Sequence, residues 1–156
     1  MLVKQLIRET LELQGFRIES VEMIDSELLV TIEPDLRYHP RCGVCGTPGD
    51  YRDTLPKRYF RHVPIWGIDM NLVYSPCRVH CPHCGGIHVE QMPWAAGKRR
   101  LTKALAVTIA TWARQLTWQQ VARLFGCSWG TVASAVAYVV DFGMARRDLS
   151  EVTHIG

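Results

Sequence analysis

Two short cysteine motifs are the residues of this sequence best suited to chemistry. Cys42 and Cys45 stand in RCGVCG, and Cys81 and Cys84 stand in HCPHCG, so both motifs read C-x-x-C-G. Two thiolates at this spacing grip one metal ion, and four complete the closed tetrahedral site of a structural Zn2+, with bonds of about 2.3 Å. The glycine after each second cysteine permits the positive φ that such a turn requires. The motifs therefore predict one structural zinc site.

Other uses of these thiols fit the sequence less well. A redox pair needs a thioredoxin-like βαβ setting, which is absent, and a disulfide framework needs an oxidising compartment. A catalytic zinc needs an open ligand position, which four thiolates do not leave. Replacement of a cysteine ligand by a neighbouring histidine stays open as an alternative, and the candidates are His80, His83 and His88. The remaining Cys77 and Cys127 are expected to be small buried apolar residues.

The two motifs can meet only if the chain between them doubles back. Residues 51–65 and 68–80 have the composition of two strands, and Trp66-Gly67 has that of a turn. Such a hairpin places residue 81 opposite about residue 52. The 35 residues between Cys45 and Cys81 then suit a zinc ribbon.

Elements before and after this ribbon follow from hydrophobic periodicity. Apolar residues at helical spacing predict a helix over residues 2–14, ended by Gly15, and alternating β-branched residues predict a hairpin over 16–24 and 27–34. Residues 85–100 have the composition of a loop. Beyond it an apolar stripe recurs about every four residues, which predicts helices to about Gly143; the stripe comprises Leu101, Leu105, Ile109, Trp112 and Leu116.

The segment TWQQVARLFGCSWGTVASAV has the form of a helix-turn-helix. Thr117 and Gln120 form a capping box before a helix over 118–125, Gly126 begins the turn, and Ser128 caps a second helix. A three-helix bundle of another kind shows the same spacing and stays open as an alternative. The predicted shared core contains Val121, Phe125, Cys127, Val132 and Ala135, and Trp112 and Trp118 are also assigned to core positions.

The second of these helices is expected to enter a DNA major groove. Its N-terminal part presents Ser128, Trp129, Gly130, Thr131 and Ser134, but it carries no Arg, Lys, Asn or Gln for bidentate base contacts. Affinity would therefore come from phosphate contacts by neighbouring cations. Those residues are Lys98, Arg99, Arg100, Lys103, Arg114 and Arg123. The basic run GKRR equally suits a solvated linker.

Composition narrows the class of protein. The chain has 156 residues, 47% hydrophobic and 21% charged, and its longest nearly apolar stretch is too short to span a bilayer. No signal peptide is recognisable, so we expect a bacterial or archaeal cytoplasmic protein without a membrane partner. Residues 1–41 carry eight acidic against five basic side chains, whereas residues 42–100 carry four against eight. This asymmetry suggests an anionic partner, although a surplus of this size also serves solubility.

The order of these parts resembles the N-terminal half of insertion-sequence transposases of the ISL-three family. The resemblance rests on the two cysteine motifs, on CRVHCPHCGGIHVEQMPW with the basic junction GKRRLTKAL, and on TWQQVARLFGCSWGTVASAV. It implies a zinc-binding segment, a helix-turn-helix and, after them, a ribonuclease-H-like domain with an Asp-Asp-Glu catalytic set. The Ile155-Gly156 pair is similar to the start of that domain's first strand. None of the three catalytic carboxylates can be placed in this sequence.

We therefore expect an α+β chain with four parts: an N-terminal helix and hairpin (1–41), a zinc-ribbon-like domain (42–96), a helix-turn-helix domain (97–145) and the start of a catalytic domain (146–156). The function predicted is the DNA-binding portion of a transposase, which recognises terminal inverted repeats in double-stranded DNA and is not itself an enzyme. A stand-alone zinc-ribbon regulator is the alternative, and a redox enzyme is a third, weaker one. Nucleoid association is expected, a small-molecule substrate is not, and homo-oligomerisation is left open.

Overall fold

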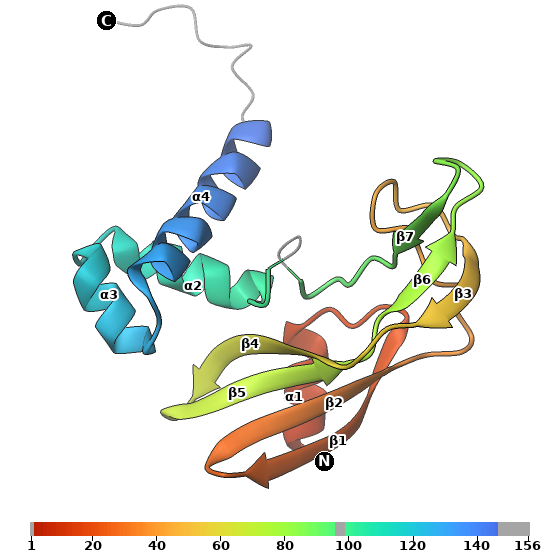
Figure 1. The fold of residues 1–156 in the computed structure, drawn as a ribbon. Helices are drawn as coiled ribbons and strands as arrows, with labels where there is room; N and C mark the ends of the chain where they lie inside the picture. Colours follow the sequence, from red (N-terminus) through yellow and green to blue (C-terminus); the bar gives the residue numbers. More distant parts are fainter. Residues whose placement is uncertain (1, 96–98, 147–156) are drawn as a thin grey trace, which may run out of the picture. The chain divides into compact units, whose positions relative to one another are not determined.

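A computed structural model describes residues 2–95 and 99–146 of the chain (Figure 1). Strands occupy the N-terminal part and helices the C-terminal part, which confirms the α+β class. The chain divides into two compact units, Met1–Ala104 and Leu105–Gly156. We call them the β-rich unit and the helical unit. The predicted start of a catalytic domain falls almost wholly outside the described residues.

A four-stranded sheet forms the larger part of the β-rich unit. Its strands are β1 (Phe16–Ile24), β2 (Glu27–Pro34), β4 (Arg58–Ile65) and β5 (Ile68–Tyr74), in the order β1-β2-β5-β4. The β1–β2 and β4–β5 pairs are antiparallel hairpins, as predicted, while β2 and β5 pair in parallel. The predicted N-terminal hairpin and part of the predicted zinc ribbon thus share one sheet, and the domain bounds within 1–96 stay a prediction.

Local turn chemistry explains both hairpins. Asp25 and Ser26 have φ of 49° and 67°, and Trp66 and Gly67 have φ of 53° and 76°. Positive φ at both central residues is the signature of the two-residue turn that matches the twist of paired strands. The turn predicted at Trp66-Gly67 is therefore confirmed.

A second, three-stranded sheet continues the β4–β5 ribbon. Its strands are β3 (Asp50–Thr54), β6 (Cys77–His80) and β7 (Ile87–Val89), all antiparallel. Asp50 lies opposite His80, close to the register expected from the turn. Each long predicted strand is broken between the sheets, at residues 55–57 and 75–76, and the predicted loop over 85–100 contains β7.

Helix α1 (Leu2–Thr10) is shorter than predicted, and its buried Ile7 belongs to the core of the four-stranded sheet. The Thr10 hydroxyl bonds the carbonyl oxygens of Leu6 and Ile7, and Glu12 has a φ of 49°, so the helix does not reach Gly15. At the centre of this core lies Trp94, 2% exposed. Its ring packs edge-on against Phe16, Tyr74 and Phe60, with centroid separations of 4.8, 5.2 and 6.1 Å.

The helical unit holds most of α2 (Lys103–Ala113), then α3 (Trp118–Phe125) and α4 (Trp129–Ala145). Its fully buried side chains are those of Leu105, Ala106, Ile109, Val121, Val132 and Ala135. Trp118, Phe125 and Cys127 are half-buried, and the assignment of Trp112 to the core is wrong because its side chain is 45% exposed. Among the described residues, no single helix has the length and apolar character to cross a membrane; α3 and α4 meet that test only as a bent pair.

Candidate metal centre and nucleic-acid interface

The four predicted cysteines come together at the end of the three-stranded sheet. Cys42 and Cys45 lie in the segment between β2 and β3, and Cys81 and Cys84 lie in the turn between β6 and β7. Their sulfur atoms all lie within 4.8 Å of one another, and the sulfurs of Cys45 and Cys81 are 3.5 Å apart. All four are free thiols, with no disulfide among them. The arrangement is one that could hold a metal ion.

Both motifs have the backbone geometry expected of metal-binding turns. The amide of Val44 donates to the sulfur of Cys42 at 3.4 Å, and the amide of Cys84 donates to the sulfur of Cys81 at 3.3 Å. Gly46 and Gly85 have φ of 74° and 64°, which confirms the reason predicted for a glycine at these positions. Their amides close the turns on the carbonyl oxygens of Cys42 and Cys81, at 2.8 and 3.1 Å.

Two further glycines bring the motifs together, and sequence reasoning missed both. The amide of Gly43 donates to the carbonyl oxygen of Val89 at 3.0 Å, and a Cβ at Gly43 would lie 2.5 Å from that oxygen. A Cβ at Gly49 would lie 2.8 Å from the carbonyl oxygen of His80. Both separations are far below van der Waals contact, so only glycine lets these backbones approach. The signal was present as one glycine inside the first cysteine motif and another shortly after it, but the backbone groups that they approach are distant in sequence.

The thiols have unequal acidities in this cluster. Hydrogen bonds from Thr47, followed by one from Cys84, lower the pKa of Cys45 to about 5. The thiol of Cys84 interacts with the Cys45 sulfur and is partly desolvated, which raises the pKa of Cys84 to about 12. Four sulfurs this close cannot all ionise without a cation among them, because like charges repel in a partly buried site. A bound metal cation would supply that charge.

The buried carboxylate of Glu90 links the end of β5 to the start of β6, and no sequence motif pointed to it. Glu90 is 4% exposed, and its Oε1 accepts hydrogen bonds from the Tyr74 hydroxyl at 2.6 Å and from the Cys77 amide at 2.7 Å. Its backbone bridges to Cys42. Burial, and then the Glu90 charge, raise the pKa of Cys77 to about 12, so this buried thiol stays protonated.

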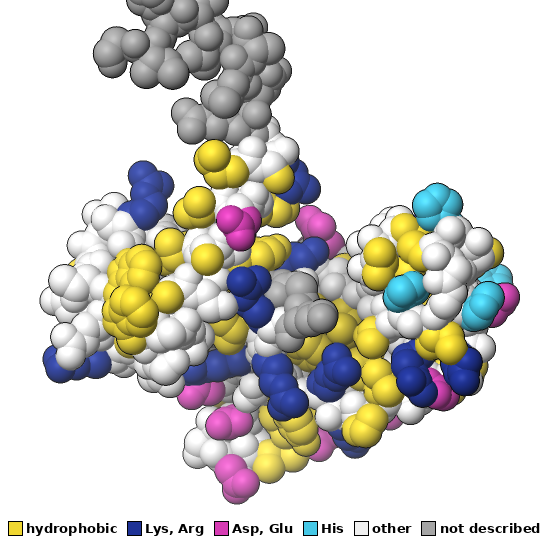
Figure 2. Space-filling view, turned by 45° about the horizontal axis from the view of Figure 1, so that its top comes forward, with side chains coloured by type: hydrophobic (Ala, Val, Ile, Leu, Met, Phe, Trp, Pro, Cys, Tyr) yellow, Lys and Arg dark blue, Asp and Glu magenta, His cyan; other side chains and the backbone are white. Residues whose placement is uncertain are grey.

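Histidine ligands are not part of the group. Within the described residues, the four cysteines alone form a potential metal cluster, and His80, His83 and His88 lie outside it. Figure 2 shows histidine side chains on the surface of the β-rich unit. The alternative of a mixed cysteine and histidine site therefore finds no support in the geometry.

Helices α3 and α4 have the geometry of a helix-turn-helix. The Thr117 hydroxyl accepts from the Gln120 amide, and the Gln120 side chain accepts from the Thr117 amide, which confirms the capping box. Gly126 ends α3 with a φ of 56°, and Ser128 caps α4. The chain bends by 106° between the two helices, within the range of about 90–120° found in such motifs.

The N-terminal turns of α4 carry the predicted base-facing residues. Trp129 is 59% exposed, and its ring lies against that of Trp118 with a centroid separation of 5.2 Å. Ser128 and Gly130 are exposed, whereas Thr131 and Ser134 are half-buried. The Ser128 hydroxyl bonds both the amide and the hydroxyl of Thr131, so these two side chains are partly engaged in capping the helix. The pairing of Trp118 with Trp129 was not predicted.

The predicted phosphate-binding cations fall into both units. Arg99, Arg100 and Lys103 lie at the C-terminal end of the β-rich unit, whereas Arg114 and Arg123 are exposed side chains of the helical unit. Lys98 lies outside the described residues. The predicted set is therefore divided between the two units.

Comparison with known proteins agrees with the helix-turn-helix. Residues 90–140 match the family model described as the helix-turn-helix domain of transposase family ISL3. The matched segment contains α2, α3, the turn and the first part of α4. No curated protein and no solved structure matches the chain. This match confirms the resemblance for residues 90–140, which are similar to the helix-turn-helix domain of these transposases.

Proposed function

We propose that this chain is the DNA-binding portion of a transposase that recognises the terminal inverted repeats of an insertion sequence. The observation that carries the proposal is the coincidence of the family match over residues 90–140 with a capped helix-turn-helix bent by 106°. The four-cysteine cluster in the same chain is what the resemblance to these transposases implies. Association with the nucleoid follows from DNA binding and is part of the proposal.

The metal in the four-cysteine site is proposed to be Zn2+. Zn2+ readily binds cysteine thiolates, whereas Mg2+ and Ca2+ prefer oxygen ligands. A tetrahedron with Zn–S bonds of about 2.3 Å has sulfur–sulfur edges of about 3.8 Å, and the Cys45–Cys81 separation of 3.5 Å is close to that value. Cys42, Cys45, Cys81 and Cys84 would fill the coordination sphere, so the zinc would order the fold and take no part in chemistry.

DNA recognition is assigned to the start of α4. Trp129, Thr131 and Ser134 present methyl, methylene and aromatic groups rather than amide or guanidinium donors. Such a surface suits contact with thymine methyl groups and with phosphates, and it does not suit bidentate recognition of guanine or adenine. Arg114 and Arg123 would supply phosphate contacts from the helical unit, and Lys98, Arg99, Arg100 and Lys103 from the basic junction.

The proposed role of the chain is binding and not catalysis. Its Asp and Glu residues show no pattern suited to two-metal phosphoryl chemistry. Strand cleavage and transfer are therefore assigned to an Asp-Asp-Glu domain of the transposase that these residues do not provide. Pairing of two ends would require two copies of the chain, so homo-oligomerisation belongs to the same proposal.

The test is selection of duplexes from a random DNA pool by the zinc-loaded full chain. We expect one zinc per chain by mass spectrometry and enrichment of a sequence motif rich in thymine. Trp129→Ala should weaken the enrichment, while Trp112→Ala, which removes another exposed tryptophan on α2, should not. Recovery of unselected sequences by the wild-type chain, or equal binding to single strands, would refute recognition of DNA ends.

A further inference from the structure

The basic junction before α2 is fastened to an edge of the four-stranded sheet. Strand β4 is the outermost strand on that side. The Arg61 amide donates to the Arg100 carbonyl oxygen, and the Thr102 amide donates to the Arg61 carbonyl oxygen, both at 2.9 Å. The Thr102 hydroxyl, fully buried, bonds Nδ1 of His62 at 2.8 Å. Residues 100–102 are therefore held against β4 and are not a free linker.

This attachment places two groups of cations side by side. Residues 57–63 and 99–103 contain six basic side chains and no acidic one; the six are Lys57, Arg58, Arg61, Arg99, Arg100 and Lys103. We call these six residues the β4 ridge. Figure 2 shows a row of Lys and Arg side chains across one face of the β-rich unit.

Most of the ridge cations are not neutralised within the unit. Arg61 pairs with Asp69 at 3.2 Å. In the described part of the chain, no ion pair engages Lys57, Arg58, Arg100 or Lys103. Three of these four, all except Arg58, are exposed. Among the described residues, the ridge thus keeps a surplus of positive charge at Lys57, Arg58, Arg100 and Lys103.

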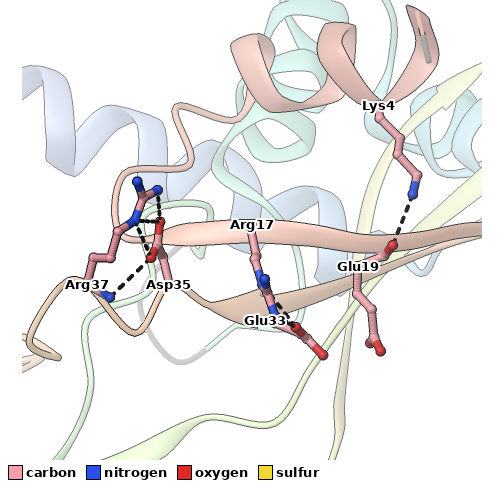
Figure 3. Close-up of polar contacts among 6 residues, drawn as sticks. All are labelled: Lys4, Arg17, Glu19, Glu33, Asp35 and Arg37. Atoms are coloured by element: carbon pink, nitrogen blue, oxygen red, sulfur yellow. Dashed lines mark hydrogen bonds and ion pairs between the residues drawn. The ribbon is translucent and has the colours of Figure 1, made fainter.

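The opposite edge of the same sheet has the opposite sign. Residues 16–34, which form β1 and β2, contain five acidic residues and only Arg17 as a base. Two cations on that side have partners, as Figure 3 shows: Arg17 pairs with Glu33 at 2.7 Å, and Lys4 donates to the Glu19 carbonyl oxygen at 3.0 Å. Just beyond β2, a hydrogen bond from Arg37 lowers the pKa of Asp35 to about 2.

We propose that the β4 ridge is a second DNA-binding surface, which contacts the phosphate backbone of duplex DNA without reading its sequence. The proposal rests on the proposed function, and it adds Lys57, Arg58 and Arg61 of the β-rich unit to the DNA contacts. The β4 residues 58–61 span about 10 Å, and duplex DNA carries about one charge per 1.7 Å of its axis. The ridge therefore faces enough phosphates to engage all its cations.

The polarity of the sheet gives the contact a direction. A polyanion is attracted to the β4 edge and repelled by the acidic β1–β2 edge, so the two signs together orient the β-rich unit on the duplex. Contacts to phosphates set position and supply affinity, while base readout is left to α4. The partner is identified as DNA, and not RNA or a lipid surface, because the same chain carries a transposase helix-turn-helix.

The test compares two triple variants of the zinc-loaded full chain that change the net charge equally. The ridge variant is Lys57→Ala, Arg58→Ala and Arg100→Ala; the control is Lys4→Ala, Arg8→Ala and Arg17→Ala. Affinity for a labelled duplex is measured by fluorescence anisotropy over a series of salt concentrations. Removing one phosphate-binding cation should reduce the slope of log K against log salt by about 0.9, so the ridge variant should show a slope smaller by about 2.7. The control should keep the wild-type slope.

Each other outcome overturns a defined claim. Equal slopes for the two variants, with the wild type still binding DNA, would refute the ridge and leave the proposed function standing. Failure of the wild type to bind any duplex would refute both. A third outcome is a ridge variant that keeps the wild-type slope of log K against log salt for DNA and yet binds RNA or anionic vesicles more weakly than the wild type does. That result would assign the surface to another partner. If the triple variant loses zinc or structure, Lys57→Ala with Arg100→Ala, both at exposed positions, should still reduce the slope by about 1.8.

Discussion

Replacing Cys42 by serine is expected to melt the three-stranded sheet and leave the four-stranded sheet folded. The reason lies in how little apolar surface the smaller sheet buries. Its buried cluster consists of Cys42, Cys77, Val79 and Cys81, of which Val79 is the one aliphatic side chain. The larger sheet shares a core of twelve buried residues with α1 and Trp94. Metal removal should therefore unfold the three-stranded sheet and leave the four-stranded sheet folded.

The magnitudes support a local effect. Ordering the twelve strand residues of β3, β6 and β7 costs about 1–2 kcal/mol each, or about 18 kcal/mol. Burial of Val79 returns about 2 kcal/mol, and seven cross-strand pairs return about 1 kcal/mol each. A structural zinc contributes about 10–16 kcal/mol, which closes this difference. Without the metal the sheet is short by about 9 kcal/mol and should not persist.

Hydrogen exchange followed by mass spectrometry measures this directly. Amides of β3, β6 and β7 should lose protection in Cys42→Ser and in chelator-treated wild type, while those of β2 and β5 keep theirs. Cys127→Ser, which removes a thiol of the helical unit, is the matched control and should leave both sheets protected. Retained protection in β3 and β6 after zinc loss would refute the reasoning. Simultaneous loss in all seven strands would show instead that the β-rich unit unfolds as one cooperative body.

Three further predictions concern groups that hold each unit together. Thr117→Ala removes one side of the capping box and should cost the helical unit about 1 kcal/mol, measured by urea unfolding followed by circular dichroism; Thr111→Ala, on the exposed face of α2, should cost less. Glu90→Leu leaves the Tyr74 hydroxyl and the Cys77 amide without their buried acceptor, and it should destabilise the β-rich unit by about 2–6 kcal/mol, whereas Glu90→Gln, which keeps an acceptor oxygen, should cost less. Burial lowers the pKa of His62 to about 4 in the folded chain. As the pH falls, the imidazole of the unfolded chain is therefore protonated before that of the folded chain. Stability should therefore fall by up to about 3 kcal/mol between pH 6.5 and pH 4. His62→Gln should flatten that part of the profile, and identical profiles for the two proteins would contradict this assignment.

Features set by neighbours a few residues apart could be predicted from the sequence. The capping box at Thr117 and Gln120, the left-handed Gly126 and the turn at Trp66-Gly67 all depend on contacts within four residues. The paired cysteine motifs belong to the same class, because each turn builds its own N–H to sulfur bonds. The meeting of the two motifs also followed, since one hairpin turn fixes which residues lie opposite each other.

Features that depend on distant segments could not be predicted. Periodicity did not show that β2 would pair in parallel with β5, because no short turn connects parallel strands and so no turn motif in the sequence indicates the pairing. Trp94 and Glu90 lie in a segment with the composition of a loop, yet Trp94 is the centre of the aromatic core and the Glu90 carboxylate links β5 to β6. Trp112 showed the converse, since its place on an apolar stripe did not make it buried.

The sequence by itself determined the metal ligands to propose, the helix-turn-helix and the family resemblance, because the residue types and their short spacings carry that information. Only the tertiary structure showed that the basic junction is hydrogen-bonded to β4. These bonds place Arg100 on the same edge of the sheet as Lys57 and Arg58. The tertiary structure also decided that this edge is opposite in sign to the edge formed by β1. The physical reason is that charge acts through space: strand order, which no local pattern encodes, sets which charges become neighbours.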